Sequence, residues 1–271
     1  MCCAGYDPTL WRCPITGWPL TIGVTLLGLA YLLVVAVPSV RKKLPFAWEH
    51  PLGAYGLFLL VTGNYLGLFF APGEKFMGDV GRILHVHVPA AWIAMLAFLI
   101  AGICAFGSLW SGKRSWDSAL EAFAEVGVME AVLLCILGAI WGRATWETWW
   151  TWDPRLTTTA VMLLAFVGLL LLRAVVTDVE RRTTWSAVAG ILATINVPIT
   201  YYSVDKAGLH QAASENFQNA ESAIDSVLRW VMYYNTAAFL FIMVWFAARR
   251  WRLAEVRAEA AMPEALPEVS T

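Results

Sequence analysis

The chain has 271 residues, of which 59% are hydrophobic and only 14% are charged, and its mean hydropathy is +0.62. Soluble domains carry about 25% charged residues, so this chain has too few polar side chains to cover a soluble particle of 30.0 kDa. These values exclude a soluble enzyme, a disordered regulator and a secreted disulfide scaffold, and they favour a polytopic membrane protein. The formal net charge of -1 gives no global field that would attract nucleic acid.

Seven apolar segments are long enough to cross a bilayer, whose hydrocarbon core needs about 20 residues per helix. They lie at 19–37, 52–71, 88–109, 122–141, 157–176, 185–203 and 227–248. We therefore predict an all-α polytopic membrane protein with a six-helix core at 46–250 and an extra N-terminal transmembrane helix within 1–45. The segment 251–271 is rich in Ala, Glu and Pro, which predicts a disordered tail.

Basic residues predict the orientation of these helices. They gather after the first, third, fifth and seventh segments, at 41–43, 113–114, 173–182 and 249–257, and are sparser in the other loops. The positive-inside rule places these groups and the C-terminus in the cytoplasm. A signal peptide would carry its basic residues before the apolar segment, so the cluster at 41–43 favours a retained first helix. Loops at 72–87, 142–156 and 204–226 are then on the outer side.

The second outer loop is unusually rich in tryptophan. Five indoles fall between residues 141 and 152, namely Trp141, Trp146, Trp149, Trp150 and Trp152. Interfacial anchoring explains two or three tryptophans at a helix end, and it remains an alternative for this loop. Five in one short loop favour an aromatic platform for a large, flat, conjugated ligand.

Three of the four histidines also lie on this predicted outer side. His85 and His87 precede Pro89, and His210 belongs to the last outer loop. Because two imidazoles can hold a haem iron from opposite faces, haem would account for both the histidines and the aromatic platform. The chain has no C-x-x-C-H motif, so such a haem would be haem b, bound non-covalently.

Nearby cations could pair with the haem propionates. The candidates are Arg82, Arg143, Arg155 and Lys206. Arginine suits a carboxylate better than lysine because its guanidinium can donate two parallel hydrogen bonds. Contact with lipid headgroups is the alternative role for each of these side chains.

Three segments resemble the cytochrome c maturation haem exporter protein C (CcmC) family, which belongs to the tryptophan-rich (WWD) haem-handling superfamily. They are GDVGRILHVHVPAA at 78–91, WGRATWETWWTWDPRLT at 141–157 and NVPITYYSVDKAGLHQ at 196–211. The resemblance extends over about 52–248 and implies that His87 and His210 are axial ligands of the haem iron. It implies that the platform consists of Trp146, Trp149, Trp150, Trp152 and Asp153.

Two further expectations concern departures from that family. His85 does not stand at the family's ligand position, so we expect it to be a neighbouring surface histidine whose replacement leaves the haem spectrum intact. The family commonly carries a tryptophan pair shortly before the second ligand, whereas this chain reads DKAGLHQ at 205–211. The family also usually has six spans, so the extra helix within 1–45 has no counterpart in it.

The resemblance implies a function without enzymatic activity. The protein would bind haem at the outer face of the bacterial inner membrane and deliver it to a membrane-anchored haem chaperone during c-type cytochrome biogenesis. Implied partners are an ABC-type ATPase, a permease-like subunit and a small single-span accessory subunit, and no nucleic acid. The chain has no Walker motif, so ATP hydrolysis would belong to a partner.

Two alternatives remain at this point. A subunit of a membrane haem or quinone oxidoreductase would usually place its histidines within the spans, where this chain has almost none. A permease for another aromatic solute would leave the histidine pair without a role.

Overall fold

The computed structural model describes residues 23, 26–31, 33–34, 37–41, 48–74, 77–203 and 226–260. These residues are almost entirely helical, and their only β-type pairing is an isolated bridge between Glu74 and Gly78. The elements are α2 (Pro38–Arg41), α3 (Glu49–Tyr65), α4 (Leu84–Ser111), α5 (Arg114–Trp146), α6 (Pro154–Val175), α7 (Val179–Tyr202) and α9 (Ser226–Ala260). A π-helix, η1 (Leu66–Phe70), extends α3, and a 3-10 helix, η2 (Asp79–Ile83), precedes α4. The all-α prediction is confirmed.

Five helices in the described part of the chain are long and apolar enough to cross a membrane. They are Glu49–Phe70, Asp79–Ser111, Arg114–Trp146, Pro154–Val175 and Val227–Arg257. The chain is therefore a multi-pass membrane protein. Helix α7 occupies the predicted sixth span, but it begins with a charged stretch at 180–182 and is more polar than the apolar windows of these five helices. The predicted span 19–37 lies largely outside the described residues.

The helices are longer than the apolar segments that predict them. Helix α4 begins at Leu84, so His85 and His87 are helical and do not belong to a loop at 72–87. Helix α5 continues to Trp146, and α9 continues to Ala260, so residues 251–260 are not the disordered tail that composition predicts. Hydropathy reports only the part of a helix that lies in hydrocarbon, whereas backbone hydrogen bonding continues into the interface and beyond.

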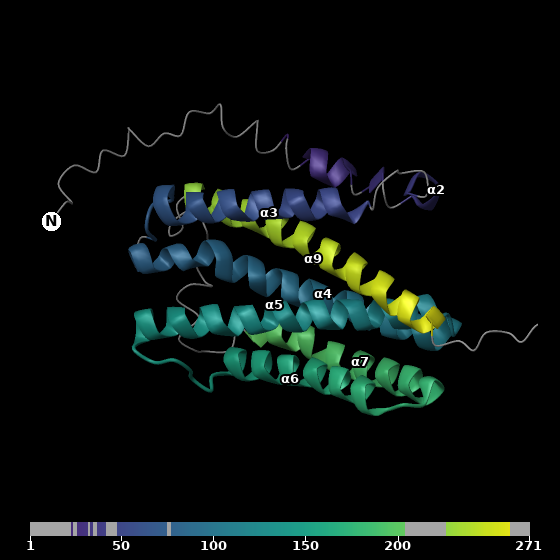
Figure 1. Ribbon diagram of the computed structural model, residues 1–271. Helices are drawn as coiled ribbons and strands as arrows, with labels where there is room; N and C mark the ends of the chain where they lie inside the picture. Colours follow the sequence, from purple (N-terminus) through teal and green to yellow (C-terminus); the bar gives the residue numbers. More distant parts are fainter. Residues whose placement is uncertain are drawn as a thin grey trace, which may run out of the picture.

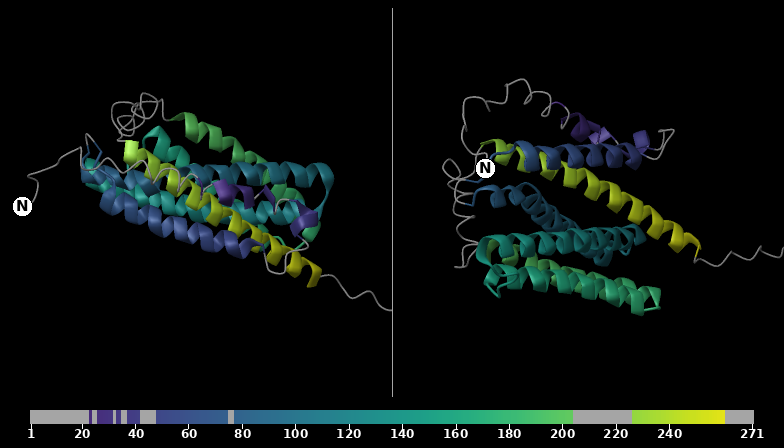
Figure 2. Two further views of the ribbon diagram at one scale, coloured as in Figure 1. Left: turned by 90° about the horizontal axis from the view of Figure 1, so that it is seen from above. Right: turned by 60° about the vertical axis from the view of Figure 1, so that its left-hand side comes forward.

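Consecutive long helices run in opposite directions and form a bundle (Figure 1). Helix α4 is central and contacts α5, α7 and α9, while α3 packs on α9 and α6 packs on α7. Figure 2 shows α9 crossing the bundle obliquely. One end of the bundle, on the left in Figure 1, holds residues 66–87, 142–156, 203 and 226–229, and we call it the site end. The opposite end is called the far end.

Aromatic rings and small residues close the helix contacts in the middle of the bundle. The rings of Phe98 on α4 and Phe166 on α6 stack with their centroids 3.9 Å apart. Gly127 on α5 lies against the Phe98 ring, where a Cβ atom would come within 2.6 Å of it. Close approach through small residues is the usual way in which membrane helices pack, because lipid provides no hydrophobic driving force between them.

Ion pairs between helices hold the far end together. Arg173 on α6 pairs with Asp117 and Glu121 on α5, each at 2.7 Å. Arg252 on α9 pairs with Glu49 on α3 at 2.8 Å, and Arg250 pairs with Glu125. The side chains of Arg173 and Asp117 are only 6% and 10% exposed, so loss of either partner would cost about 3–5 kcal/mol. Some of the basic residues that predict a cytoplasmic side therefore also fix the helix packing there.

Candidate haem-binding site

The tryptophan-rich segment is a short extended connection whose shape is set by Asp153. The carboxylate of Asp153 accepts hydrogen bonds from the backbone N–H groups of Arg155 and Leu156, at 2.9 and 3.0 Å, and from the Thr151 hydroxyl at 2.7 Å. Asp153 is thus the N-cap of α6, and Pro154 occupies the first helical position, where its missing N–H costs nothing. The Asp-Pro pair therefore shapes the connection, and both carboxylate oxygens are used in that role.

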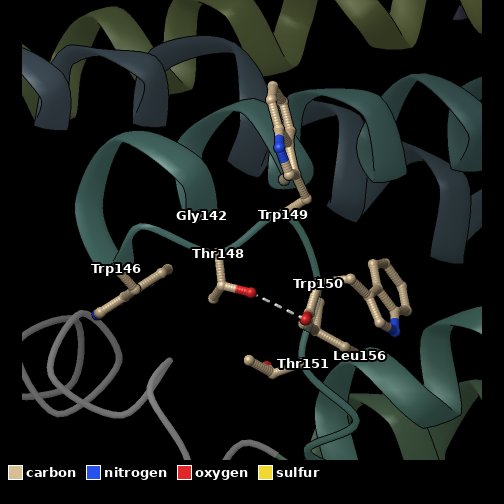
Figure 3. A pocket seen from close by; sticks show the side chains of 8 residues that line it. Gly142, Trp146, Thr148, Trp149, Trp150, Thr151 and Leu156 are labelled. Atoms are coloured by element: carbon tan, nitrogen blue, oxygen red, sulfur yellow. Dashed lines mark hydrogen bonds between the residues drawn. The ribbon is translucent and has the colours of Figure 1, made fainter.

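The connection and the end of α5 enclose a hollow at the site end. Its lining residues are Gly138, Gly142, Trp146, Thr148, Trp149, Trp150, Thr151 and Leu156 (Figure 3). The hollow has an empty volume of about 290 Å³, which includes space open to solvent. The space inside it that is closed off from solvent is only about the size of one water molecule, so the hollow could hold no more than one edge of a large planar ligand. The rest of such a ligand would lie on the side chains around it.

The indoles around the hollow do not form one flat plane. Figure 3 shows the side chains of Trp146, Trp149 and Trp150 pointing in different directions from the connection. Trp149 is 62% exposed and Trp152 is 77% exposed, and the Trp152 ring meets Trp150 edge-to-face at 5.8 Å. We call these three indoles, Trp149, Trp150 and Trp152, the tryptophan rim. The rim offers apolar area at the surface, where a ligand remains accessible from outside.

Trp141 has a different role from the other indoles of the motif. It is 2% exposed and belongs to a small core with Ala71, Leu84 and Leu228. Its ring contacts Trp146, with the centroids 5.3 Å apart. Trp141 therefore supports the hollow from inside the bundle.

His87 lies beside Gly138, one of the residues that line this hollow. It is buried in the first turns of α4, and its ring meets Trp141 at a centroid distance of 5.3 Å. Its Cε1 atom is so close to Gly138 that a Cβ atom there would lie 3.1 Å away. Gly138 also lines the hollow. The structure thus brings the predicted iron ligand and the tryptophan segment, which are distant in sequence, to the same glycine.

His210 and Lys206 lie outside the described residues. Helix α7 ends at Tyr202 and α9 begins at Ser226, both at the site end. The chain therefore leaves and re-enters the described bundle at the end where His87 and the tryptophan rim are found.

The three predicted arginines differ in their surroundings. Arg82 donates to the carbonyl of Leu68 at 2.9 Å and pairs with Asp79 at 3.1 Å, and Arg143 donates to the carbonyl of Glu147. Arg155 is half-buried in the first turn of α6, and its guanidinium makes no hydrogen bond to any residue that the structure describes. Arg155 is therefore the best placed of the three to receive a carboxylate.

His85 is a correction to the sequence analysis, because it is not a surface residue. It is 1% exposed, its Nδ1 faces the carbonyl oxygen of Arg82, and its Nε2 lies 3.2 Å from Asn64 Oδ1. Both ring nitrogens point at oxygen atoms inside the protein, so neither is directed at an iron site. Burial of this ring could not be read from the sequence, since the hydropathy pattern places residue 85 in a loop.

Known proteins similar to this chain place it in a family. The model of the family described as Heme exporter protein C matches residues 31–265. Proteins named Heme exporter protein C are similar to it: that of Escherichia coli K12 is 32% identical over 189 residues, covering 69% of this chain and 77% of the relative. The relative from Haemophilus influenzae is 33% identical over 213 residues, which cover 76% and 84% of the two chains. In Bradyrhizobium diazoefficiens the identity is 33% over 201 residues, with coverage of 73% and 76%.

The chain belongs to the haem exporter protein C family. The matched range includes every helix from α3 to α9 and therefore the hollow, His87 and the tryptophan rim. The resemblance of the three sequence motifs to this family is confirmed.

Five residues that line the hollow were missed by the sequence analysis, namely Gly138, Gly142, Thr148, Thr151 and Leu156. Gly138 and Gly142 line the hollow together with Trp146, and the three stand at intervals of four residues along α5. That spacing places them on one face of the helix. The spacing of four residues could therefore have pointed to this face. It does so only if the helix continues to Trp146, and the apolar segment 122–141 does not predict that.

Proposed function

We propose that the protein binds haem at the outer face of the bacterial inner membrane and delivers it to a membrane-anchored haem chaperone during c-type cytochrome biogenesis. The observation that carries this proposal is that His87 and the tryptophan-lined hollow both border Gly138. A neutral imidazole is a common ligand of haem iron, and indoles supply apolar area for the macrocycle. The printed name of the relatives, Heme exporter protein C, supports haem as the cargo.

Each site residue has a distinct role in this proposal. His87 and His210 bind the iron, while Trp146 and the tryptophan rim contact the macrocycle. Arg155 pairs with a propionate. Arg82 and Arg143 could also pair with one, but each would first have to give up a hydrogen bond or ion pair within the protein. Asp153 acts through the conformation of the connection. The protein carries haem without transforming it, so we assign no enzymatic reaction to it.

The geometry suits a site that must release its ligand. A haem held from below by His87 would rest on indoles that are largely exposed, so one edge of the macrocycle stays accessible to a second protein. Full burial would lengthen the residence time, because displacement would then require the bundle to open. We therefore propose that the tryptophan rim is where the chaperone receives haem. The ABC-type ATPase, the permease-like subunit and the small single-span subunit are proposed as the other partners.

The proposed function is tested by purification in detergent. We expect the protein to copurify with haem that gives a Soret band and that leaves the polypeptide on acid-acetone extraction, because no C-x-x-C-H motif attaches it. Incubation with the soluble domain of a haem chaperone should move the haem to the chaperone. Haem that stays on the polypeptide after extraction contradicts non-covalent binding. Redox cycling with a quinol, without transfer, would favour an oxidoreductase.

The orientation follows from the distribution of charge between the two ends. We place the site end outside, because the far end carries the basic groups around Lys113, Arg173 and Arg249. In a variant whose five native cysteines are replaced by serine, we expect Thr148→Cys to be labelled by an impermeant maleimide from the periplasm. Ala260→Cys should be labelled only after the membrane is opened. Labelling of both positions in intact cells would reverse the assignment.

A further inference from the structure

The start of α4 is attached to the end of α3 by a buried histidine that is not itself a proposed ligand. His85 Nδ1 faces the carbonyl oxygen of Arg82, and its Nε2 lies 3.2 Å from Asn64 Oδ1. Both partners are acceptors, so a neutral ring, which has one N–H, donates to one of them at a time. The amide nitrogen of Asn64 donates to the carbonyl of Leu60 at 2.8 Å, which turns its Oδ1 toward His85. The imidazole therefore joins the first turn of α4 to α3 through a side chain whose own orientation is fixed.

The π-helix at the end of α3 makes room for this ring. Gly67 in η1 lies against the His85 imidazole, and a Cβ atom at that position would overlap it. The neighbouring carbonyl of Leu68 accepts a hydrogen bond from Arg82. Arg82, just before α4, and His85, in its first turn, thus both contact the same short stretch of η1. We call His85, Asn64 and Gly67 the His85 clamp.

The backbone of α4 is weakened at this point, so the clamp replaces a missing restraint. Pro89 lies inside α4 and has no N–H. The backbone hydrogen bond that would join residue 89 to the carbonyl of His85 is therefore absent. The rotation of the first turn about the helix axis depends correspondingly more on side-chain contacts.

Rotation of that turn decides where His87 points. Residues two apart on an α-helix face directions about 200° apart, and the contacts agree: His85 faces α3, whereas His87 faces Gly138 and Trp141 on α5. Holding one ring on α3 holds the other on α5. We infer that His85 is a positioning residue, which keeps the His87 imidazole under the hollow at the orientation that haem ligation requires. This inference rests on the proposed function.

Replacement of the clamp should alter haem binding without removing a ligand. His85→Phe keeps a ring over Gly67 and loses the polar contacts to Arg82 and Asn64, and Asn64→Leu removes the α3 partner at similar volume. We expect each to weaken haem binding about 10- to 100-fold, as removal of groups that orient metal-bound histidines does, and to broaden or shift the Soret band. The double variant should be no worse than either single variant, because both act through one contact. His50→Ala is the control, since His50 is exposed on α3 toward the far end.

A rescue experiment separates positioning from general stability. In a His87→Gly variant supplied with free imidazole, the exogenous ligand does not depend on the rotation of α4. Adding His85→Phe to that variant should therefore leave haem content and the Soret band unchanged. A further loss there would show that His85 acts on the bundle as a whole, and the inference would be overturned. Helix content by circular dichroism and elution from a sizing column report whether each variant is folded.

The two proposals fail in different ways. If the wild-type protein carries no haem and transfers none to the chaperone, the proposed function is wrong. If His87→Ala keeps the haem content and spectrum of the wild type, the ligand assignment is wrong and the clamp has nothing to position. If His87→Ala loses haem while folded His85→Phe and Asn64→Leu bind it as the wild type does, only the clamp is wrong.

Discussion

Replacement of His87 is expected to remove the haem spectrum or shift its Soret maximum, with haem per protein falling at least about tenfold. The iron–imidazole bond is directional and sets the spectrum, and neither of its neighbours, Gly138 or Trp141, offers an iron ligand of comparable strength. The measurement is the absorption spectrum and haem content of purified His87→Ala. His210→Ala should have a comparable effect, because the second axial position would then open to water.

A matched variant separates the loss of the ligand from the loss of packing. His87→Ala leaves a cavity beside Trp141 and costs some stability, whereas His87→Leu fills most of that volume without an imidazole. Both should lose the wild-type spectrum, and only His87→Ala should unfold at a lower temperature. If His87→Leu binds haem with an unchanged Soret band, His87 is a core residue and the assignment of the ligand is wrong.

Removal of the tryptophan rim is expected to have the second large effect. Aromatic contact depends on apolar area shared among several rings, so Trp149→Ala, Trp150→Ala or Trp152→Ala alone should weaken haem binding roughly two- to tenfold. The triple variant should weaken it by roughly a hundredfold or more, because no ring of the rim remains to share the contact. Haem per protein and haem delivered to the chaperone are measured for each.

The structure supplies the control for this series. Trp149 and Trp152 are mostly exposed, so their replacement should have little effect on folding. Trp110, at the far end of α4, is 82% exposed, and Trp110→Ala removes the same kind of side chain away from the hollow. A triple variant that keeps full haem and full transfer would show that the rim only anchors the protein in the membrane interface.

The His85 clamp changes one expectation of the sequence analysis. Sequence position alone makes His85 a surface neighbour of the ligand, whose replacement should be silent. Its burial and its polar contacts with Arg82 and Asn64 make it part of the framework that orients His87. We therefore expect His85 variants to be affected, although less than His87 variants, because they retain both proposed ligands.

The sequence by itself determined the fold class, five of the apolar spans between residues 52 and 248, and the family. These depend on composition and on motifs such as WGRATWETWWTWDPRLT, which are properties of a continuous stretch of chain. The tryptophan segment and His87 were also named from sequence, because indoles and imidazoles near a predicted interface suggest a specific ligand. None of these conclusions requires knowledge of which helices are neighbours.

The tertiary structure decided which side chains meet and which are buried. Helix ends beyond the hydrocarbon core have no hydropathy signal, so only the structure placed His85, His87 and Trp146 on helices. Asp153 became a helix cap, Trp141 a core residue and Gly138 the contact between His87 and the hollow, because each role depends on a backbone conformation or on another helix. A sequence records which groups are present, whereas the packing of α4 against its neighbours decides which group each of them faces.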